Sequence, residues 1–251
     1  MICLRDCRRI QKVQNKMKGL KVNVLTIFPD MIENFLNYGI VRRAIEKELF
    51  SVSIVNIRDS AVDKHKTVDD KPYGGGAGMI MKPDILASSV ESTVPFKKNK
   101  RPEVIFLTPQ GKHFNQSKAN RLSMLDEVIL VCGRYRAIDE RFRELYVTEE
   151  LSVGDFVLSG GEPAAMVIID AVARLIPGVL NDFESGIEDS FQTNLLDCPW
   201  YTRPEIFKGH KVPDVLLSGN HAEIKKWRYE QSVKRTSQRR PDLLDNSKDE
   251  L

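Results

Sequence analysis

Apolar residues follow two alternating patterns in the first part of the chain, and together these patterns predict an α/β fold. Residues 21–28 (KVNVLTIF) are rich in β-branched residues and stop at a proline, which is typical of a strand. Residues 31–49 carry apolar residues at helical spacing and predict one helix, with a glycine in its middle. Residues 52–57 (VSIVNI) predict a second strand. Because strand, helix and strand in succession indicate a parallel sheet, we expect this half of the chain to be α/β.

Residues 59–81 depart from both patterns, because they are polar and contain the glycine run Gly74–Gly78 (GGGAG). Such a stretch predicts a loop. Its glycines match neither GxGxxG nor GxxxxGKS/T, which argues against a dehydrogenase or a kinase that binds a nucleotide through one of these motifs. A lone loop histidine such as His65 is more often solvated or structural than catalytic, whereas a long charged loop in an α/β unit more often has a function.

Two later strands end in turns that contain glycine. Residues 103–108 (EVIFLT) run into Pro-Gln-Gly, and residues 127–132 (EVILVC) run into Gly-Arg-Tyr. Ligands of parallel α/β sheets bind beyond the carboxyl ends of the strands. We therefore expect residues 108–111, 133–136 and 152–161 to converge on one pocket.

Residues 151–180 (LSVGDFVLSGGEPAAMVIIDAVARLIPGVL) combine a short apolar run with a helix. The run Val153–Leu158 predicts a buried segment, and it ends at Gly160-Gly161, where glycines permit positive φ and close approach of a ligand. A proline suited to a first helical turn follows, and apolar residues continue at near-helical spacing. Asp170 and Arg174 are four residues apart on this helix and so share a face. A core helix with one ion pair and a functional site explain this spacing equally well.

Composition limits the class of protein. The chain has 251 residues, of which 41% are hydrophobic, and this is enough for a substantial core. Its four cysteines (Cys3, Cys7, Cys132 and Cys198) form neither a CxxC pair nor a compact cluster, which argues against a zinc site and against a disulfide framework. No apolar run approaches the roughly 18 residues of a membrane span, and the N-terminus lacks the apolar core of a signal peptide. We expect a cytoplasmic globular protein without a membrane partner.

Charge is distributed unevenly, although the net charge is only +3. Residues 1–19 hold six Lys or Arg and one acid, which favours a disordered leader over a nucleic-acid-binding arm, and translation from Met17 is an alternative. Residues 181–190 hold four acids and no base, a composition typical of a linker. Residues 197–240 hold ten Lys or Arg against five acids, and a predicted helix at 220–233 carries a cationic surface suited to RNA phosphates. A solvated helix face is the alternative there.

Long motifs in a fixed order carry a resemblance to a known family. They are HKTVDDKPYGGGAGM at 65–79, LTPQG at 107–111, LVCGRY at 130–135, DERF at 139–142, VGDFVLSGGE at 153–162, RLIPGVL at 174–180, EDSF at 188–191, LLDCPWYTRPE at 195–205 and VLLSGNHAEIKKWR at 215–228. From Lys21 to about Leu244 the chain resembles the bacterial tRNA (guanine-N1)-methyltransferases that act on guanosine 37. The resemblance implies an S-adenosylmethionine-dependent enzyme of the SPOUT class, an α/β fold whose parallel sheet carries a C-terminal trefoil knot and is followed by a small all-helical domain.

The same resemblance implies a domain organisation and partners. We expect a basic N-terminal extension at 1–19, a knotted α/β domain that binds S-adenosylmethionine at 20–181, an interdomain linker at 182–196 and a helical tRNA-binding domain at 197–251. The expected partners are tRNA and a second copy of the chain, in a homodimer whose active site is shared between subunits. The resemblance also suggests Mg²⁺, but no acidic cluster in the sequence identifies metal ligands.

The cofactor site implied by the resemblance is built from the three strand ends noted above. Carried over by motif, its residues are Phe106, Leu107, Pro109, Gly133, Tyr135, Val153, Gly154, Asp155, Phe156, Val157, Leu158, Gly160 and Gly161. Two departures stand out. This chain has GRYRA at 133–137 where the family usually has GRYEG, so Arg136 occupies a glutamate position beside the methionine moiety. It also has GEPAA at 161–165 where the family has GELPA.

The chemistry implied by the resemblance needs a base and a cation. Guanine N1 carries a proton at neutral pH, and its removal leaves negative charge shared with O6. Asp189 matches the family's general base in EDSF, and Arg174 matches its catalytic arginine. A catalytically silent RNA-binding protein that keeps the knot is the rival interpretation, and Arg136 is the residue that favours it.

Overall fold

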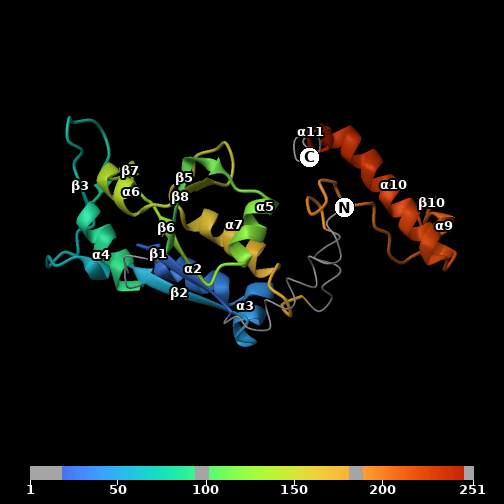
Figure 1. Ribbon diagram of the computed structural model, residues 1–251, viewed down its shortest axis with the longest axis horizontal. Coiled ribbons are helices and arrows are strands. Elements are labelled where there is room, and N and C mark those ends of the chain that lie inside the picture. The colour runs from blue at the N-terminus through green and yellow to red at the C-terminus, as the bar shows by residue number, and fades with distance from the viewer. Residues whose placement is uncertain (1–18, 94–101, 181–188, 246–251) are drawn as a thin grey trace. The chain divides into compact units, whose positions relative to one another are not determined.

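The computed structural model describes residues 19–93, 102–180 and 189–245. The chain divides into two compact units, Met1–Asn181 and Asp182–Leu251 (Figure 1). The expected N-terminal extension, apart from Gly19, and residues 182–188 of the expected linker lie outside the described residues. None of the helices in the described ranges is both long enough and apolar enough to cross a membrane.

A five-stranded parallel sheet forms the centre of the first unit, with the strand order β2-β1-β6-β5-β8. Its strands in chain order are β1 (Leu20–Thr26), β2 (Phe50–Asn56), β5 (Glu103–His113), β6 (Glu127–Cys132) and β8 (Glu149–Ser152). Residues on both sides of the central strands are buried, as is usual for a parallel sheet covered on both faces. The predicted parallel α/β fold is therefore confirmed.

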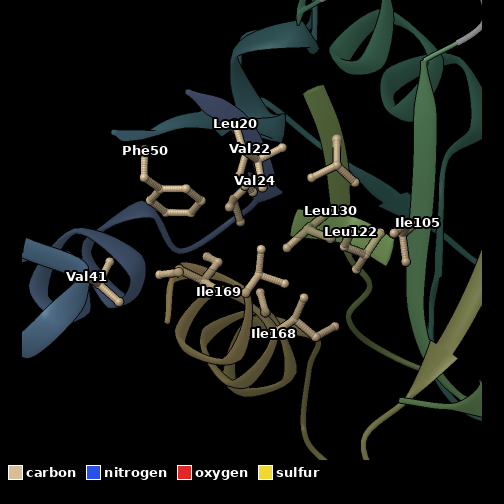
Figure 2. Packing of buried hydrophobic residues seen from close by; sticks show 14 of the residues in the cluster. Leu20, Val22, Val24, Val41, Phe50, Ile105, Leu122, Leu130, Ile168 and Ile169 are labelled. Carbon is tan, nitrogen blue, oxygen red and sulfur yellow. The ribbon is translucent and has the colours of Figure 1, made fainter. Parts of the chain in front are cut away.

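Helices cover the two faces of this sheet and divide the core into two clusters. The first face packs against α2 (Pro29–Leu36), α3 (Gly39–Glu46), α5 (Gln116–Ser123) and α7 (Glu162–Ala173). Figure 2 shows Ile168 and Ile169 of α7 among Val24 of β1, Leu130 of β6 and Phe50 of β2. The second face packs against η1 (Ile57–Ser60), α4 (Pro83–Thr93) and α6 (Glu140–Tyr146).

Two elements differ from the sequence-based expectations in the first unit. The single helix expected at 31–49 is split into α2 and α3, because Gly39 adopts φ +64° and interrupts the helical backbone. The expected loop at 59–81 contains two short strands, β3 (Asp69–Asp70) and β4 (Ile80–Met81). These strands pair antiparallel, and β4 also pairs in parallel with β7 (Ala137–Ile138). The glycine run thus connects the two strands of a hairpin.

The second unit contains a long helix and a small hairpin. Its described helices are α9 (Asp214–Leu217), α10 (His221–Arg239) and α11 (Asp242–Asp245). The side chain of Asn220 caps α10 by accepting hydrogen bonds from two backbone N–H groups. Strands β9 (Ile206–Phe207) and β10 (His210–Lys211) form an antiparallel hairpin, so this unit is not all-helical as expected. The hairpin forms because Lys208 and Gly209 both adopt positive φ, which produces a tight two-residue turn.

Candidate active site

A cavity of about 260 Å³ lies at the carboxyl ends of β5, β6 and β8. Its lining comes mainly from residues 106–110, 133–138 and 151–161, which overlap the three segments predicted to converge, 108–111, 133–136 and 152–161. The residues carried over to the cofactor site line this cavity, with one exception: Phe106, Leu107, Pro109, Gly133, Tyr135, Val153, Gly154, Phe156, Val157, Leu158, Gly160 and Gly161. The exception is Asp155, which is exposed and places its carboxylate 3.2 Å from Nε2 of His113.

A bulge in β5 forms one wall of the cavity. Leu151 of β8 is the register partner of both Leu107 and Lys112, so residues 108–111 loop out of the sheet between them. Pro109 has no N–H to donate to a neighbouring strand. Gly111 is needed where the chain returns, because a Cβ there would lie 2.5 Å from the backbone carbon of Glu150.

Two glycines allow the segment after β8 to lie directly against the end of β6. The Gly161 N–H donates to the Gly133 carbonyl at 3.0 Å. A Cβ on Gly161 would lie 2.7 Å from Cα of Cys132, and a Cβ on Gly133 would lie 2.7 Å from the ring of Phe106. Gly161 itself has φ −77°. This glycine is therefore required for close approach of two backbone segments, and not for the positive φ that the sequence also allowed.

A buried ion pair lies beneath the glycine loop. Glu162 is completely buried, and its Oε2 accepts a hydrogen bond from Arg134 Nε at 3.1 Å. Its Oε1 accepts a second one from Thr26 Oγ1 at 2.7 Å. The guanidinium of Arg134 also lies 4.5 Å from the ring centroid of Phe28. The network links the ends of β1 and β6 to the start of α7. Sequence reasoning missed it, since a glutamate in a first helical turn is usually solvated.

Burial in this region also affects a cysteine. Burial raises the pKa of the Cys132 thiol well above its ordinary value, and the negative charge of Glu162 adds to that shift. The thiol therefore stays protonated and behaves as a small apolar side chain in the core. Within the described ranges, no group of three or more His, Cys, Asp or Glu side chains is arranged to hold a metal ion.

Arg136 holds the glycine-rich hairpin loop beside the cavity. Its Nη1 donates to the Ala77 carbonyl at 2.9 Å, and its backbone N–H donates to the Met79 carbonyl at 3.1 Å. A Cβ on Gly78 would lie 3.2 Å from Cβ of Arg136. The arginine side chain therefore packs directly on the backbone of the glycine loop. The arginine at the family's glutamate position thus has a structural partner in this chain, the β3–β4 loop.

The neighbouring Tyr135 is held by the same hairpin. Its backbone adopts φ +60°, which is uncommon for a residue with a Cβ. Burial raises the pKa of Tyr135, and the nearby Asp69 carboxylate of β3 raises it further. Since Tyr135 lines the cavity, the β3–β4 hairpin helps to fix one of its walls.

The rim of the cavity is apolar and exposed. Phe156 and Val157 are 56% and 87% exposed, and Leu158 is exposed too, so the prediction of a buried run is wrong for these three residues, whereas Val153 packs against the core. These side chains belong to the loop between β8 and α7. Exposed apolar residues grouped at a cavity are typical of surfaces that a ligand or a partner covers.

The two candidate catalytic residues lie in different units. Arg174 follows the last residue of α7 in the first unit, and it is exposed on the helix face that also carries Asp170 and Val167. Asp189 is the first described residue of the second unit, where its carbonyl accepts a hydrogen bond from the Gln192 N–H at 3.4 Å. The remaining face of α7 packs into the core, so the predicted core helix is confirmed, and the functional role of its exposed face stays a prediction.

Comparison with known proteins identifies the family of this chain. The family model described as tRNA (Guanine-1)-methyltransferase TrmD matches residues 20–246. The chain is 52% identical over 225 residues to the tRNA (guanine-N(1)-)-methyltransferase of Wolbachia pipientis subsp. Culex pipiens, covering 89% of this chain and 96% of that protein. It is 54% identical to the protein of the same name from Citrifermentans bemidjiense, covering 90% of each. For the Bacillus pumilus protein of that name the identity is 52%, covering 91% of this chain and 93% of the relative. Because the match extends over nearly the whole of both chains, this protein belongs to the tRNA (guanine-1)-methyltransferase TrmD family.

Proposed function

We propose that this protein transfers a methyl group from S-adenosylmethionine to N1 of guanosine 37 in tRNA. Relatives that are more than half identical carry the name tRNA (guanine-N(1)-)-methyltransferase, which supports an enzyme and disfavours a silent RNA-binding protein. The observation that carries the proposal is the cavity at the ends of β5, β6 and β8, whose walls come from the motifs shared with the family.

The cavity has the chemistry that the cofactor needs. Phe106, Leu107 and Ile138 offer apolar contact to an adenine ring, and the glycine turns at 133 and 160–161 bring backbone to the wall of the cavity without side chains in between. When bound, S-adenosylmethionine supplies an electrophilic methyl group on its sulfonium. The residues of the three strand ends would hold it, and the exposed apolar rim at Phe156–Leu158 would exclude water from it.

The proton and the developing charge on guanine require residues of the protein. In the proposed mechanism the carboxylate of Asp189 accepts the N1 proton, and the guanidinium of Arg174 donates hydrogen bonds to O6 as negative charge develops there. The carboxylate takes up the proton that leaves N1 as the methyl group is transferred to it. Arginine suits the second role because its charge and its fork of donors are fixed.

We also propose a homodimer in which each active site combines two subunits. Arg174 belongs to the first unit and Asp189 to the second, and the proposal pairs the first unit of one copy with the second unit of the other. The exposed face of α7 supports this, because Val167 on it is 51% exposed although α7 is otherwise an apolar core helix. An apolar residue beside a candidate catalytic arginine is well placed for a subunit contact.

The trefoil knot and the domain organisation belong to the same proposal. Strand β8 lies at the edge of the sheet beside β5, yet the chain after it returns to the end of β6 at Gly133 and continues into α7, which packs over β1. We propose that this return passes beneath the segment after β6 and ties the knot within residues 20–181. Residues 182–196 would then link it to a tRNA-binding unit at 197–251.

Methyl transfer to an unmodified tRNA transcript tests the proposal. We expect labelled methyl from S-adenosylmethionine to appear as 1-methylguanosine at position 37, and a transcript with adenosine at that position to stay unlabelled. Label on another base, or on another atom of guanosine 37, would contradict the proposed reaction. The same assay with and without EDTA tests the Mg²⁺ requirement that the resemblance suggests.

A further inference from the structure

The second unit contains a cavity of its own, with a volume of about 530 Å³. Its lining comes from residues 199–205 and from the elements around α9 and α10. The lining residues that matter for its chemistry are Trp200, Tyr201, Arg203, Glu205, Ile224 and Arg228. The volume is within the range of small-molecule sites, which is roughly 300–1,000 Å³. No candidate catalytic or cofactor-binding residue lines it, so the reaction proposed above does not account for it.

Trp200 is held in a fixed orientation at this cavity while much of its ring stays exposed. Its Nε1–H donates to Oδ2 of Asp197 at 2.5 Å, and the guanidinium carbon of Arg228 lies 4.4 Å from the ring centroid. The side chain is nevertheless 57% exposed. Since both the indole N–H and the ring are already engaged, a ligand that stacks on Trp200 would not have to order it first.

The residue that fixes Trp200 is itself anchored. The Asp197 N–H donates to Ser190 Oγ at 2.9 Å, and its carbonyl accepts a hydrogen bond from Arg235 Nη1 of α10 at 3.0 Å. The indole is therefore connected through Asp197 to the long helix. A surface tryptophan that only covers the core would not need its orientation fixed by such a network of hydrogen bonds.

The other walls of the cavity suit a flat, partly polar ring. Tyr201 is 48% exposed, and its ring centroid lies 6.4 Å from that of Trp227. Val212, Leu216 and Ile224 add apolar contact, while Arg203 and Glu205 provide a donor and an acceptor. Nucleobases have this combination of an apolar face and hydrogen-bonding edges.

Positive charge lies at this cavity. Arg203 and Arg228 line it, and Lys225 is exposed on α10 next to the lining residue Ile224. Phosphates of an RNA strand would be attracted to them. Proteins recognise single-stranded RNA by stacking unpaired bases on aromatic side chains and on arginine, beside a cationic track for the backbone.

We propose that this cavity binds one unstacked nucleobase from a single-stranded loop of the tRNA substrate, with the base stacked at Trp200 and the backbone facing Lys225. The inference rests on the proposed function for the identity of the RNA. It adds a specific nucleobase site to the second unit, for which the sequence indicated only a cationic surface.

Equilibrium binding of a tRNA transcript to the full-length protein provides the first test. Trp200→Ala should weaken binding by about 5- to 150-fold, the range expected for loss of one base–aromatic stack, while Trp200→Phe should retain most of the affinity. Tyr229→Ala is the matched control, because Tyr229 is an exposed aromatic residue of α10 that does not line the cavity. It should bind tRNA like the wild type.

Salt dependence separates stacking from charge. Trp200→Ala should leave the slope of log K against log salt concentration unchanged, because no phosphate contact is lost. Lys225→Gln should reduce that slope by about one. A change of slope in Trp200→Ala would mean that the residue acts on the phosphate contacts, and would contradict the stacking.

Fluorescence keeps the proposal testable if Trp200→Ala folds poorly. The chain has two tryptophans, so Trp227→Phe leaves Trp200 as the single emitter, and tRNA should quench it. Absence of quenching in a variant that still binds tRNA would overturn the proposal. So would a Trp200→Ala variant that changes the oligomeric state at unchanged tRNA affinity, because protein would then cover the cavity. A wild-type protein that binds tRNA through Trp200 but methylates no guanosine would refute the proposed function and leave this site standing.

Discussion

The carboxylate of Glu162 and the guanidinium of Arg134 form an ion pair at 3.1 Å, in which the glutamate is completely buried. Glu162 begins α7, and Arg134 follows β6, so the pair joins two segments that line the cavity. A buried charge loses its hydration and depends on its partners, here Arg134 and Thr26. The pair therefore fixes the glycine loop, which directly precedes Glu162, to the buried ends of β1 and β6.

Removing one member of this pair should destabilise the protein strongly. Arg134→Met leaves the buried Glu162 carboxylate without its cation, and we expect the free energy of unfolding to fall by about 3–5 kcal/mol. Urea denaturation measures this. Arg42→Ala is the control, because it breaks an exposed ion pair with Glu46 and should change stability very little. A loss in Arg134→Met as small as that of the control would show that the carboxylate does not depend on Arg134.

The same pair explains what a side chain at Gly160 would do. A Cβ there would lie 2.2 Å from Arg134 Nε and 2.6 Å from Glu162 Oε2, so Gly160→Ala must displace the ion pair. We expect at least a tenfold loss of S-adenosylmethionine affinity by calorimetry, together with a stability loss of about 1–3 kcal/mol from overpacking. Ser51→Ala serves as the control, because Ser51 is exposed on β2 and does not line the cavity. Wild-type affinity in a folded Gly160→Ala protein would remove this glycine from the proposed cofactor site.

The parts of the site that could be predicted are those encoded by local patterns. The apolar runs at 103–108 and 127–132 predict strands, the turns after them predict strand ends, and the geometry of parallel sheets then brings those ends together. Glu162 could not be recognised as buried, because its burial depends on Thr26 and Arg134, which are distant in sequence. The cavity at Trp200 was also missed, since its walls come from segments that no local period connects.

The contact of Arg136 with the Ala77 carbonyl could not be predicted either, because the two residues are distant in sequence. This contact leads to a third prediction. Arg136→Glu cannot donate to the Ala77 carbonyl, so the hairpin loop should open more often. We expect amide hydrogen exchange at residues 75–79 to increase about fivefold, which corresponds to roughly 1 kcal/mol for one hydrogen bond. Arg141→Gln is the control, because the hydrogen bonds of that guanidinium go to Asp139. Unchanged exchange in Arg136→Glu would show that other contacts hold the hairpin.

A fourth prediction concerns the shared active site. Arg174→Ala and Asp189→Asn should each be nearly inactive alone, but mixing the two after subunit exchange should restore about a quarter of wild-type activity. In a mixed dimer, one of the two sites would combine the intact Arg174 of one copy with the intact Asp189 of the other. If both residues act within one subunit, every mixed dimer keeps a defect in each site and the mixture stays inactive. Methyl-transfer assays before and after exchange distinguish the two arrangements.

The last prediction assigns the chemistry to Asp189. Asp189→Asn keeps the size and polarity of the side chain but cannot accept the N1 proton, so we expect single-turnover methylation to slow by about 10²- to 10⁴-fold with the fold and cofactor affinity unchanged. Arg174→Ala should slow the same step, and the double variant should lose less than the product of the two single losses, because both side chains serve one transition state.

Two controls make this assignment specific. Asp170→Asn alters a carboxylate on the same exposed face of α7 as Arg174 and should retain most of the activity, since it is not proposed to touch guanine. The Asp189→Asn protein should also bind S-adenosylmethionine and tRNA like the wild type, because the substitution removes the proton acceptor and keeps the size of the side chain. A near-wild-type rate for Asp189→Asn at saturating tRNA and S-adenosylmethionine would remove Asp189 from the mechanism, and the base would then have to be sought among the residues that line the cavity of the first unit.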